Sequence, residues 1–354
     1  MLQVALTFDY EIFFGENYGT TKEILFDPTE RLLETLNQYN VKASFFADVL
    51  SVFMHEKYGL NSYCEQYIDQ IKRMVAAGHD VQLHIHPNWL TSEFADGKWD
   101  FDTQHYRIHT FGFDRKDQMS VPHMIEWGKA FLEKHLQSVD PAYRCVAYRA
   151  GGYCAQPHEK LFGVLNENGI FIDSSVSAMM KADGINVYDY MDVPEGKTGW
   201  WLRNDGAISK QVKKENGDTY EVPVGCVSNS LLRRILMPSS ERVLQLGTMR
   251  GAYIGQNTTP TKKKAPNRLS LLLSYGKGKQ RLSVDSLKFT VILRGLKKYA
   301  RKAKGNAYVA VIGHPKLINN IWLENFESFL RKSCEHQKFC FVTMQEIAVA
   351  EGKN

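Results

Sequence analysis

The 354-residue chain has few cysteines, and none of them falls into a metal-binding or disulfide-type pattern. There is no CxxC pair and no regular spacing between the six thiols, which argues against a zinc finger and a small disulfide-stapled domain. We therefore predict reduced thiols in a cytoplasmic protein. The cysteines are Cys64, Cys145, Cys154, Cys226, Cys334 and Cys340.

Membrane and export signals are lacking as well. No apolar run approaches the ~20 residues that a bilayer-spanning helix needs. Residues 1–9 contain no basic stretch, no long apolar core and no small-residue cleavage site, so they are typical of a first strand rather than a leader. The sequence also lacks internal repeats and low-complexity segments. We expect a soluble protein, cytoplasmic or peripheral at the inner membrane.

The composition is globular, but the charge is unevenly distributed. Hydrophobic residues make up 44% and charged residues 23%, which excludes a disordered or collagen-like chain. Residues 262–304 hold fourteen Lys and Arg and one acid, Asp285, so their net charge is +13. Because the whole chain carries +5, the remainder carries −8. A mildly acidic body therefore carries one strongly basic segment.

Short apolar runs alternate with amphipathic helical patterns along the chain. Helical spacing predicts helices from Asp27 and over 63–77, 159–168 and 321–333. This rhythm indicates βαβ units, a parallel sheet and an α/β barrel formed by residues 1–354 as one domain. Long insertions at about 89–140 and 177–220 follow strand ends, where barrel loops carry function. Strands are predicted at 4–8, 41–46, 80–86, 144–150, 170–174, 220–224, 307–314 and 339–343.

Two pairs of polar residues stand at predicted strand ends. Asp9 and Glu11 are two apart, so they point to the same side of a strand, although such a pair is more often a cap or a salt-bridge partner. His84 and His86 have the same spacing and would form a bidentate metal platform. Two hydrogen-bonded structural histidines remain the alternative.

Three further strand ends carry polar residues or glycines. Arg149 runs into Gly151-Gly152, a turn whose unshielded amides can bind an oxyanion. His314 ends another strand, and Asp173, if it lies nearby, would hold that imidazole in one tautomer and raise its pKa. Parallel strands would bring all these ends to one barrel mouth. This set suits metal-assisted hydrolysis. One carboxylate and two histidines would hold a metal, a second carboxylate would act as base, and a separate histidine would act as acid.

These motifs resemble those of the NodB-type polysaccharide deacetylases of carbohydrate esterase family 4, in the WalW-like branch found in bacterial surface-polysaccharide clusters. The resemblance covers roughly residues 1–350 apart from the two insertions. It implies a distorted (β/α)7 barrel that hydrolyses an N-acetyl, less often O-acetyl, group on a sugar. The motifs are 7–11 (TFDYE), 44–46 (SFF), 78–87 (GHDVQLHIHP), 149–152 (RAGG), 173–175 (DSS) and 313–315 (GHP).

The resemblance also implies roles for individual residues. Asp9 matches the catalytic base and His314 the general acid. Arg149 matches the arginine that orients the base, Asp173 the acid that tunes the histidine, and the amide of Gly152 the oxyanion donor.

The metal set departs from the family pattern. The family usually has adjacent aspartates, whereas Tyr10 follows Asp9 here, so Glu11 is the predicted ligand. The residue four after His84 is Asn88 where the family usually has a second histidine, so His86 is predicted to replace it. The expected cofactor is a divalent metal, with zinc as the first choice. If neither Glu11 nor His86 reaches an ion, the alternatives are a metal-free glycan-binding pseudoenzyme and a metal-independent cyclic-amide hydrolase.

Partners are predicted from aromatic and basic residues. Trp89 and Tyr153 are the expected sugar contacts, with Trp200 and Trp201 beside the second insertion, although core packing is the commoner role of tryptophan. Residues 285–304 are predicted to form a helix with a basic outer face. We expect a carbohydrate substrate, free or lipid-linked, and no nucleic acid. We also expect peripheral contact with anionic membrane or glycolipid through 262–304.

Overall fold

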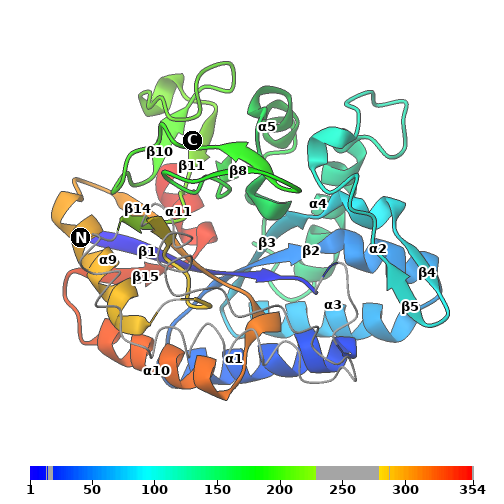
Figure 1. The fold of residues 1–354 in the computed structure, drawn as a ribbon, viewed down its shortest axis with the longest axis horizontal. Helices are drawn as coiled ribbons and strands as arrows, with labels where there is room; N and C mark the ends of the chain where they lie inside the picture. Colours follow the sequence, from blue (N-terminus) through cyan, green and yellow to red (C-terminus); the bar gives the residue numbers. More distant parts are fainter. Residues whose placement is uncertain (13, 15–18, 229–278, 287, 353–354) are drawn as a thin grey trace, which may run out of the picture.

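A curled, mostly parallel β-sheet forms the centre of the molecule (Figure 1). The computed structural model describes residues 1–12, 14, 19–228, 279–286 and 288–352. The strands follow the order β10-β11-β7-β6-β3-β2-β1-β14, and β15 also pairs with β1. They are β1 (Leu2–Tyr10), β2 (Ser44–Asp48), β3 (Asp80–Ile85), β6 (Ala147–Ala150), β7 (Ile172–Asp173), β10 (Trp200–Leu202), β11 (Thr219–Glu221), β14 (Ala307–Gly313) and β15 (Phe339–Val342).

The sequence of β1 explains its central place. All but one of its residues are buried, as expected of a strand covered on both faces, and it pairs in parallel with β2, β14 and β15. The sheet curls until its far end meets β14 again through short bridges. Val224 bridges Ala310, and the Gly225 amide donates to the Ala310 carbonyl at 2.9 Å. The expected α/β fold, a distorted barrel, is confirmed.

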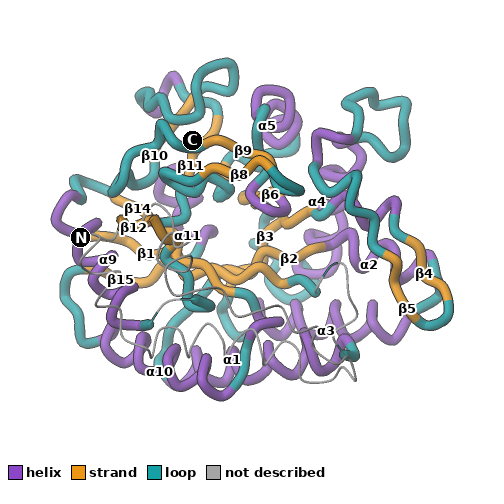
Figure 2. The backbone as a smooth tube through the Cα atoms, in the orientation of Figure 1, coloured by secondary structure: helices purple, strands orange, loops and turns teal. Residues whose placement is uncertain are grey.

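Helices cover the outside of the sheet (Figures 1 and 2). The helices predicted from Asp27 and over 63–77, 159–168 and 321–333 are present with boundaries shifted by one or two residues, whereas α2, α4 and α11 were not predicted. The α-helices are α1 (Asp27–Gln38), α2 (Val49–Lys57), α3 (Asn61–Ala76), α4 (Val121–Leu136), α5 (His158–Glu167), α9 (Phe289–Lys302), α10 (Asn320–Cys334) and α11 (Met344–Glu351). Short helical turns are η1 (Lys22–Phe26), η2 (Pro87–Thr91), η3 (Ile108–Thr110), η4 (Gly151–Tyr153), η5 (Lys214–Asn216) and η6 (Pro315–Leu317).

The two predicted insertions contain secondary structure of their own. The first ends in α4, where a Cβ added to Gly128 would lie 2.8 Å from Leu83 of β3. Glycine therefore lets α4 approach the sheet closely, so this helix belongs to the barrel wall rather than to a mouth loop. The second insertion contains a hairpin and β10. The small two-stranded antiparallel sheets are β4 (Glu93–Ala95) with β5 (Lys98–Asp100), β8 (Lys181–Asp183) with β9 (Val187–Asp189), and β12 (Cys226–Ser228) with β13 (Lys279–Arg281).

The basic segment is only partly described, because residues 262–278 and Leu287 lie outside the described residues. The helix starts at Phe289 rather than at residue 285. The preceding residues lie against β14 instead, since the Val284 amide donates to the Ile312 carbonyl at 2.9 Å. The outer face of α9 is partly neutralised, because Lys298 pairs with Glu195 at 2.5 Å.

Two further predictions can be compared with the structure. All six cysteines are unpaired, four of them buried, as the reduced-thiol prediction requires. Among the described residues, no helix has the combination of length and apolar character needed to cross a bilayer.

Candidate active site

Four strands deliver polar side chains to one end of the barrel. Because β1, β2, β3, β6 and β14 are parallel neighbours, their carboxyl ends lie side by side. In the register, His84 stands opposite Arg149 and Phe8 opposite Gly313, so Asp9, Glu11 and His314 follow at the same edge. The sequence singled out all five of the polar residues at this edge. They are Asp9, Glu11, His84, Arg149 and His314.

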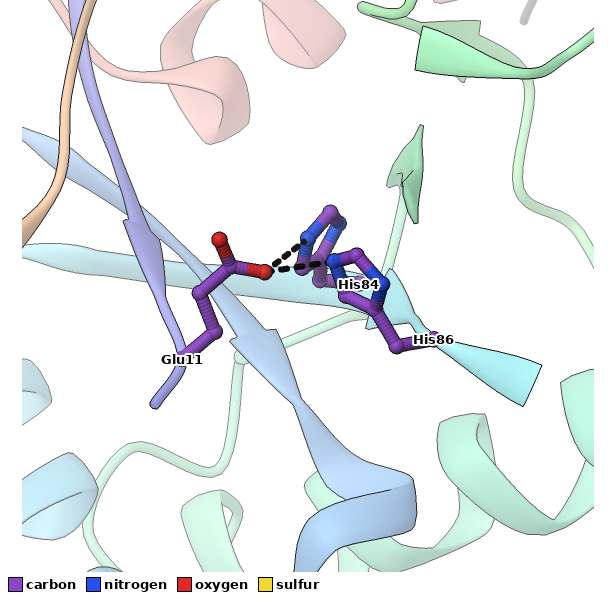
Figure 3. A group of neighbouring side chains, drawn as sticks. All are labelled: Glu11, His84 and His86. Atoms are coloured by element: carbon purple, nitrogen blue, oxygen red, sulfur yellow. Dashed lines mark hydrogen bonds and ion pairs between the residues drawn. The ribbon is translucent and has the colours of Figure 1, made fainter. Parts of the chain in front are cut away.

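Glu11, His84 and His86 form a buried cluster (Figure 3). Glu11 Oε2 lies 3.1 Å from His84 Nε2 and 2.5 Å from His86 Nε2. The three side chains are at most 6% exposed. The structure thus brings the predicted ligand set together, although their role as ligands stays a prediction.

The donor chemistry of this cluster fits a divalent metal. His84 Nδ1 donates to the Arg149 carbonyl at 2.8 Å, which leaves Nε2 as the nitrogen directed at Glu11. One ligand atom from each residue lies within 4.8 Å of the others, close enough to share one ion. His86 Nδ1 is buried with no hydrogen-bond partner among the described residues. One carboxylate and two imidazoles match zinc and similar ions that keep open positions.

Asp9 is held by Arg149 beside this cluster. Arg149 Nη1 donates to Asp9 Oδ1 at 2.6 Å, while its other nitrogens donate to Thr7 and to Ser174. The guanidinium is fully buried and stacks 4.1 Å from the centre of the Phe46 ring. Burial alone would raise the pKa of Asp9, but the charges of Arg149 and of two histidines outweigh it and hold the pKa below its usual value. Asp9 is therefore a carboxylate at neutral pH.

His314 is oriented by Asp285 and not by Asp173. Its Nδ1 lies 2.8 Å from Asp285 Oδ2, and its backbone amide donates to Asp285 Oδ1 at 3.0 Å. Trp322 Nε1 donates to the same carboxylate at 3.2 Å. Burial lowers the pKa of His314, but Asp285 and the site carboxylates raise it more, so the pKa lies above its usual value. The prediction for Asp173 was therefore wrong, and Asp285, counted only as the single acid of the basic segment, takes this position.

Asp173 belongs to a separate buried network. Its carboxylate accepts the Ser175 amide at 3.0 Å and the Ser175 hydroxyl at 2.7 Å. Its neighbour across the β7–β11 pairing is Glu221, another fully buried carboxyl. Burial raises the pKa of both groups, that of Glu221 well above its ordinary value. The Ser175 hydroxyl also accepts the Ala150 amide at 2.9 Å, so Asp173 supports the backbone next to Arg149.

Lys316 is a site residue that sequence reasoning missed. Its ammonium donates to Glu11 Oε1 at 2.7 Å and to the Ile12 carbonyl at 3.1 Å. Burial would raise the pKa of Glu11, but Lys316 and His86 outweigh it and hold the pKa well below its usual value. The available signal was the position of Lys316 two residues after His314, but one lysine in a turn did not reveal its reach.

The turn after β6 is tightly packed. Gly152 has a φ of 59°, and a Cβ added there would lie 2.3 Å from Asn186 Oδ1. Tyr153 follows with a φ of 65°, an uncommon conformation for an aromatic residue. The Tyr190 hydroxyl donates to the Tyr153 carbonyl at 2.7 Å. The backbone conformation and the close approach of Asn186 favour glycine at position 152. Tyr153 is held partly exposed beside the site.

The tryptophan prediction was wrong. Trp89 has no exposed surface and donates from Nε1 to Asp48 Oδ2 at 2.7 Å, so it cannot stack on a sugar. Trp200 and Trp201 are 1% and 5% exposed and belong to the core. Asn88, in the place of the family's second histidine, is also fully buried, and both polar atoms of its amide lack a partner within the described part of the chain.

Comparison with solved structures finds similar chains at low identity. A protein of Mycobacterium smegmatis described as a polysaccharide deacetylase is 15% identical over 99% of this chain and 89% of its own, with a TM-score of 0.48. One of Pseudomonas aeruginosa PAO1, described in the same way, is 15% identical over 98% and 89%, with a TM-score of 0.46. Puue allantoinase is 14% identical over 98% and 89%, also with a TM-score of 0.46. With TM-scores below 0.5, these likenesses decide nothing about activity.

A family comparison bears on the N-terminal part of the chain. Residues 3–157 match the sequence model described as polysaccharide deacetylase. This range contains Asp9, the Glu11, His84 and His86 cluster, and Arg149. His314, Asp285 and Lys316 lie beyond it. The part of the chain that contains the predicted base, the arginine paired with it and the predicted metal ligands therefore matches the polysaccharide deacetylase family.

Proposed function

We propose that this protein is a metal-dependent hydrolase that removes an N-acetyl, or O-acetyl, group from a sugar of a bacterial surface polysaccharide or its precursor. The proposal includes membership of the NodB-type deacetylases, in the WalW-like branch. The observation that carries it is the position of the Glu11, His84 and His86 cluster beside both Asp9 and His314. His314 Nε2 lies 3.6 Å from Asp9 Oδ2 and 3.7 Å from Glu11 Oε1.

Each residue of the site has a role in this reaction. When bound by Glu11, His84 and His86, a divalent ion such as zinc would supply Lewis-acid polarisation of water and of the acetyl carbonyl. Arg149 occupies Asp9 Oδ1, so Oδ2 accepts the proton of the attacking water. Asp285 fixes the His314 ring through Nδ1, which leaves Nε2 to protonate the departing amine. The Gly152 amide is the proposed donor to the developing oxyanion.

The main rival among enzymes is a metal-independent cyclic-amide hydrolase. Lys316 is the observation that favours it, because its ammonium already provides a fixed positive charge on Glu11. A glycan-binding pseudoenzyme is the rival from another class. Metal content separates the first proposal from both rivals.

The experiment combines elemental analysis with acetate release from N-acetylated and O-acetylated saccharides. We expect about one zinc or similar ion per chain, and a loss of at least about 100-fold in acetate release in Asp9→Asn and His84→Ala. Asp205→Asn and His135→Ala, which alter residues outside the site, are the matched controls and should retain activity. A metal-free protein whose Asp9→Asn variant loses nothing would refute the proposal.

The basic helix carries a separate proposal about the partner. Lys298 and Lys302 contact Glu195, and among the other basic residues of α9 the exposed ones are Arg294 and Arg301, which we propose meet an anionic lipid or glycolipid. Replacing both by glutamate should abolish binding to vesicles that contain phosphatidylglycerol. Unchanged binding would contradict the proposal.

A further inference from the structure

Arg281 is a fixed guanidinium close to the candidate active site. It ends β13, where Nε donates to Ser177 Oγ at 2.6 Å and Nη2 donates to the Tyr188 hydroxyl. Its guanidinium carbon lies 4.3 Å from the centre of the Tyr153 ring and 5.8 Å from that of Tyr188. Two hydrogen bonds and two rings thus hold one orientation of the group.

The partners that Arg281 has among the described residues, Ser177, Tyr188 and Tyr153, are all neutral. Within the described residues, no carboxylate lies within 4.0 Å of its guanidinium, and Nη1 donates to no acceptor there. Arg149, by contrast, has the carboxylate of Asp9 as a counterion. A partly buried cation held only by neutral groups is unfavourable unless an anion joins it. The planar fork of a guanidinium matches a carboxylate or a phosphate.

Tyr153 links Arg281 to the reacting groups. It directly follows the Gly151-Gly152 turn at the end of β6, and its ring packs against the guanidinium. The charges of Asp9, Arg149 and Asp285 all act on the pKa of Tyr153, which burial raises. Arg281 therefore lies against a side chain that borders the proposed acetyl site.

We propose that Arg281 and Tyr153 form a subsite for an anionic group of the substrate, so that the enzyme acts on an acidic saccharide. This proposal rests on the proposed function. Tyr153 contributes an aromatic ring beside the acetylated sugar, and Arg281 binds a carboxylate or a phosphate attached to it or to the neighbouring sugar. Both sources of negative charge share the same recognition chemistry.

A purely structural role for Arg281 is the alternative that the experiment must exclude. In that case Arg281 would only connect β13 to Ser177 and to the β8–β9 hairpin through Tyr188. Its loss would then lower stability without changing the relative affinity for acidic and neutral ligands.

The test measures binding by calorimetry, so it does not depend on turnover. The probes carry a methylsulfonamido group in place of the acetamido group, which prevents hydrolysis of the amide. One pair is glucosamine-type sugar linked to glucuronate against the same sugar linked to glucose. A second pair is the sugar 1-phosphate against its methyl glycoside. The two pairs distinguish a carboxylate from a phosphate as the bound group.

We expect the full-length protein to bind one acidic probe at least about 10-fold more tightly than its neutral partner. Arg281→Gln should abolish this preference without changing the affinity for the neutral probe, and Arg281→Lys should retain part of it. Arg203→Gln, which removes an exposed arginine paired with Asp205, is the control and should change neither. If Arg281→Gln fails to fold, Tyr188→Phe keeps the charge but loosens its anchor, and it should reduce the preference several-fold.

Two results would overturn the inference: equal affinity for acidic and neutral probes in the wild-type protein, or a preference that survives both Arg281→Gln and Tyr188→Phe. Failure of the proposed function is a different result, namely the absence of acetate release from any acetylated saccharide. Since the probes are not hydrolysed, an acidic preference can stand while the deacetylase proposal falls, and the reverse also holds.

Discussion

Lys316 and a bound metal ion would compete for the same carboxylate, which makes Lys316→Met a quantitative test of the metal site. Lys316 Nζ lies 2.7 Å from Glu11 Oε1, and the two side chains are 12% and 6% exposed. At such burial the pair is poorly screened by solvent. In the metal-free protein Lys316 therefore neutralises part of the charge that a divalent ion would otherwise attract.

The size of the effect follows from the buried pair. Removing one partner of a buried ion pair costs about 3–5 kcal/mol of stability, because the other charge is left uncompensated. A hydrogen bond to a charged group contributes about 1.5–3 kcal/mol, which corresponds to roughly 10- to 100-fold in an equilibrium constant. We therefore expect metal-free Lys316→Met to be about 3 kcal/mol less stable than wild type, and to bind zinc roughly 10- to 100-fold more tightly.

The assay combines zinc titration against a chromophoric chelator with urea unfolding in the presence and absence of zinc. Added zinc should restore most of the stability that Lys316→Met loses, since an ion that binds only the folded state stabilises it. Lys332→Met is the control, because Lys332 pairs with Glu335 on the surface and both are about half exposed. A zinc affinity that is unchanged or weaker in Lys316→Met would refute the idea that the ion and the lysine share Glu11.

Four other substitutions test the neighbouring networks. Asp285→Asn should lower acetate release about 100-fold, because it removes the charged acceptor that orients His314. Asp173→Asn should lower it far less. A larger loss of kcat in Asp173→Asn than in Asp285→Asn would contradict the assignment of Asp285 as the partner of His314. Because the folded-state pKa of Glu221 is raised, this carboxyl holds its proton more strongly in the folded than in the unfolded state above about pH 4.3, so the contribution of Glu221 to stability should fall as pH rises from there. Glu221→Gln should remove much of this decline in urea unfolding between pH 4 and 8, and an unchanged pH profile would count against it. Gly152→Ala should lower the free energy of unfolding by about 1–3 kcal/mol, because position 152 has a left-handed backbone conformation and the added Cβ meets a side-chain oxygen at 2.3 Å. A melting temperature equal to that of the wild type would be inconsistent with this packing.

The strand-end residues could be predicted because strand direction is encoded locally. Alternation along β1 and β3 places Asp9 and Glu11, and likewise His84 and His86, on common sides, and parallel pairing brings the strand ends together. Arg149 follows from the same rule, one strand further along the sheet. Neither step requires knowledge of loop conformation.

The missed residues depend on loops or on burial. Asp285 reaches His314 because residues 282–284 pair with β14, a long-range contact that no local pattern in the basic segment indicates. Lys316 reaches Glu11 across 305 residues of sequence through a short helical turn. Trp89 was predicted as a sugar contact from its residue type, but the β4–β5 segment covers it with Trp99 and Phe101. Tryptophan favours both cores and sugar sites, so residue type alone could not decide between them.

The pairing of charges at the site leads to the same substrate class as the geometry of Arg281. The three acids of the site each have a cation: Asp9 has Arg149, Glu11 has Lys316, and Asp285 has His314. In the metal-free protein these cations are already paired, so a negatively charged substrate would gain nothing from them without separating a buried pair, at a cost of several kcal/mol. Arg281, beside these pairs, is a cation whose partners among the described residues are all neutral. An acidic saccharide can therefore place its charge on Arg281 while Asp9 and His314 stay free for the acetyl group, whereas a neutral saccharide would leave this cation without a counterion.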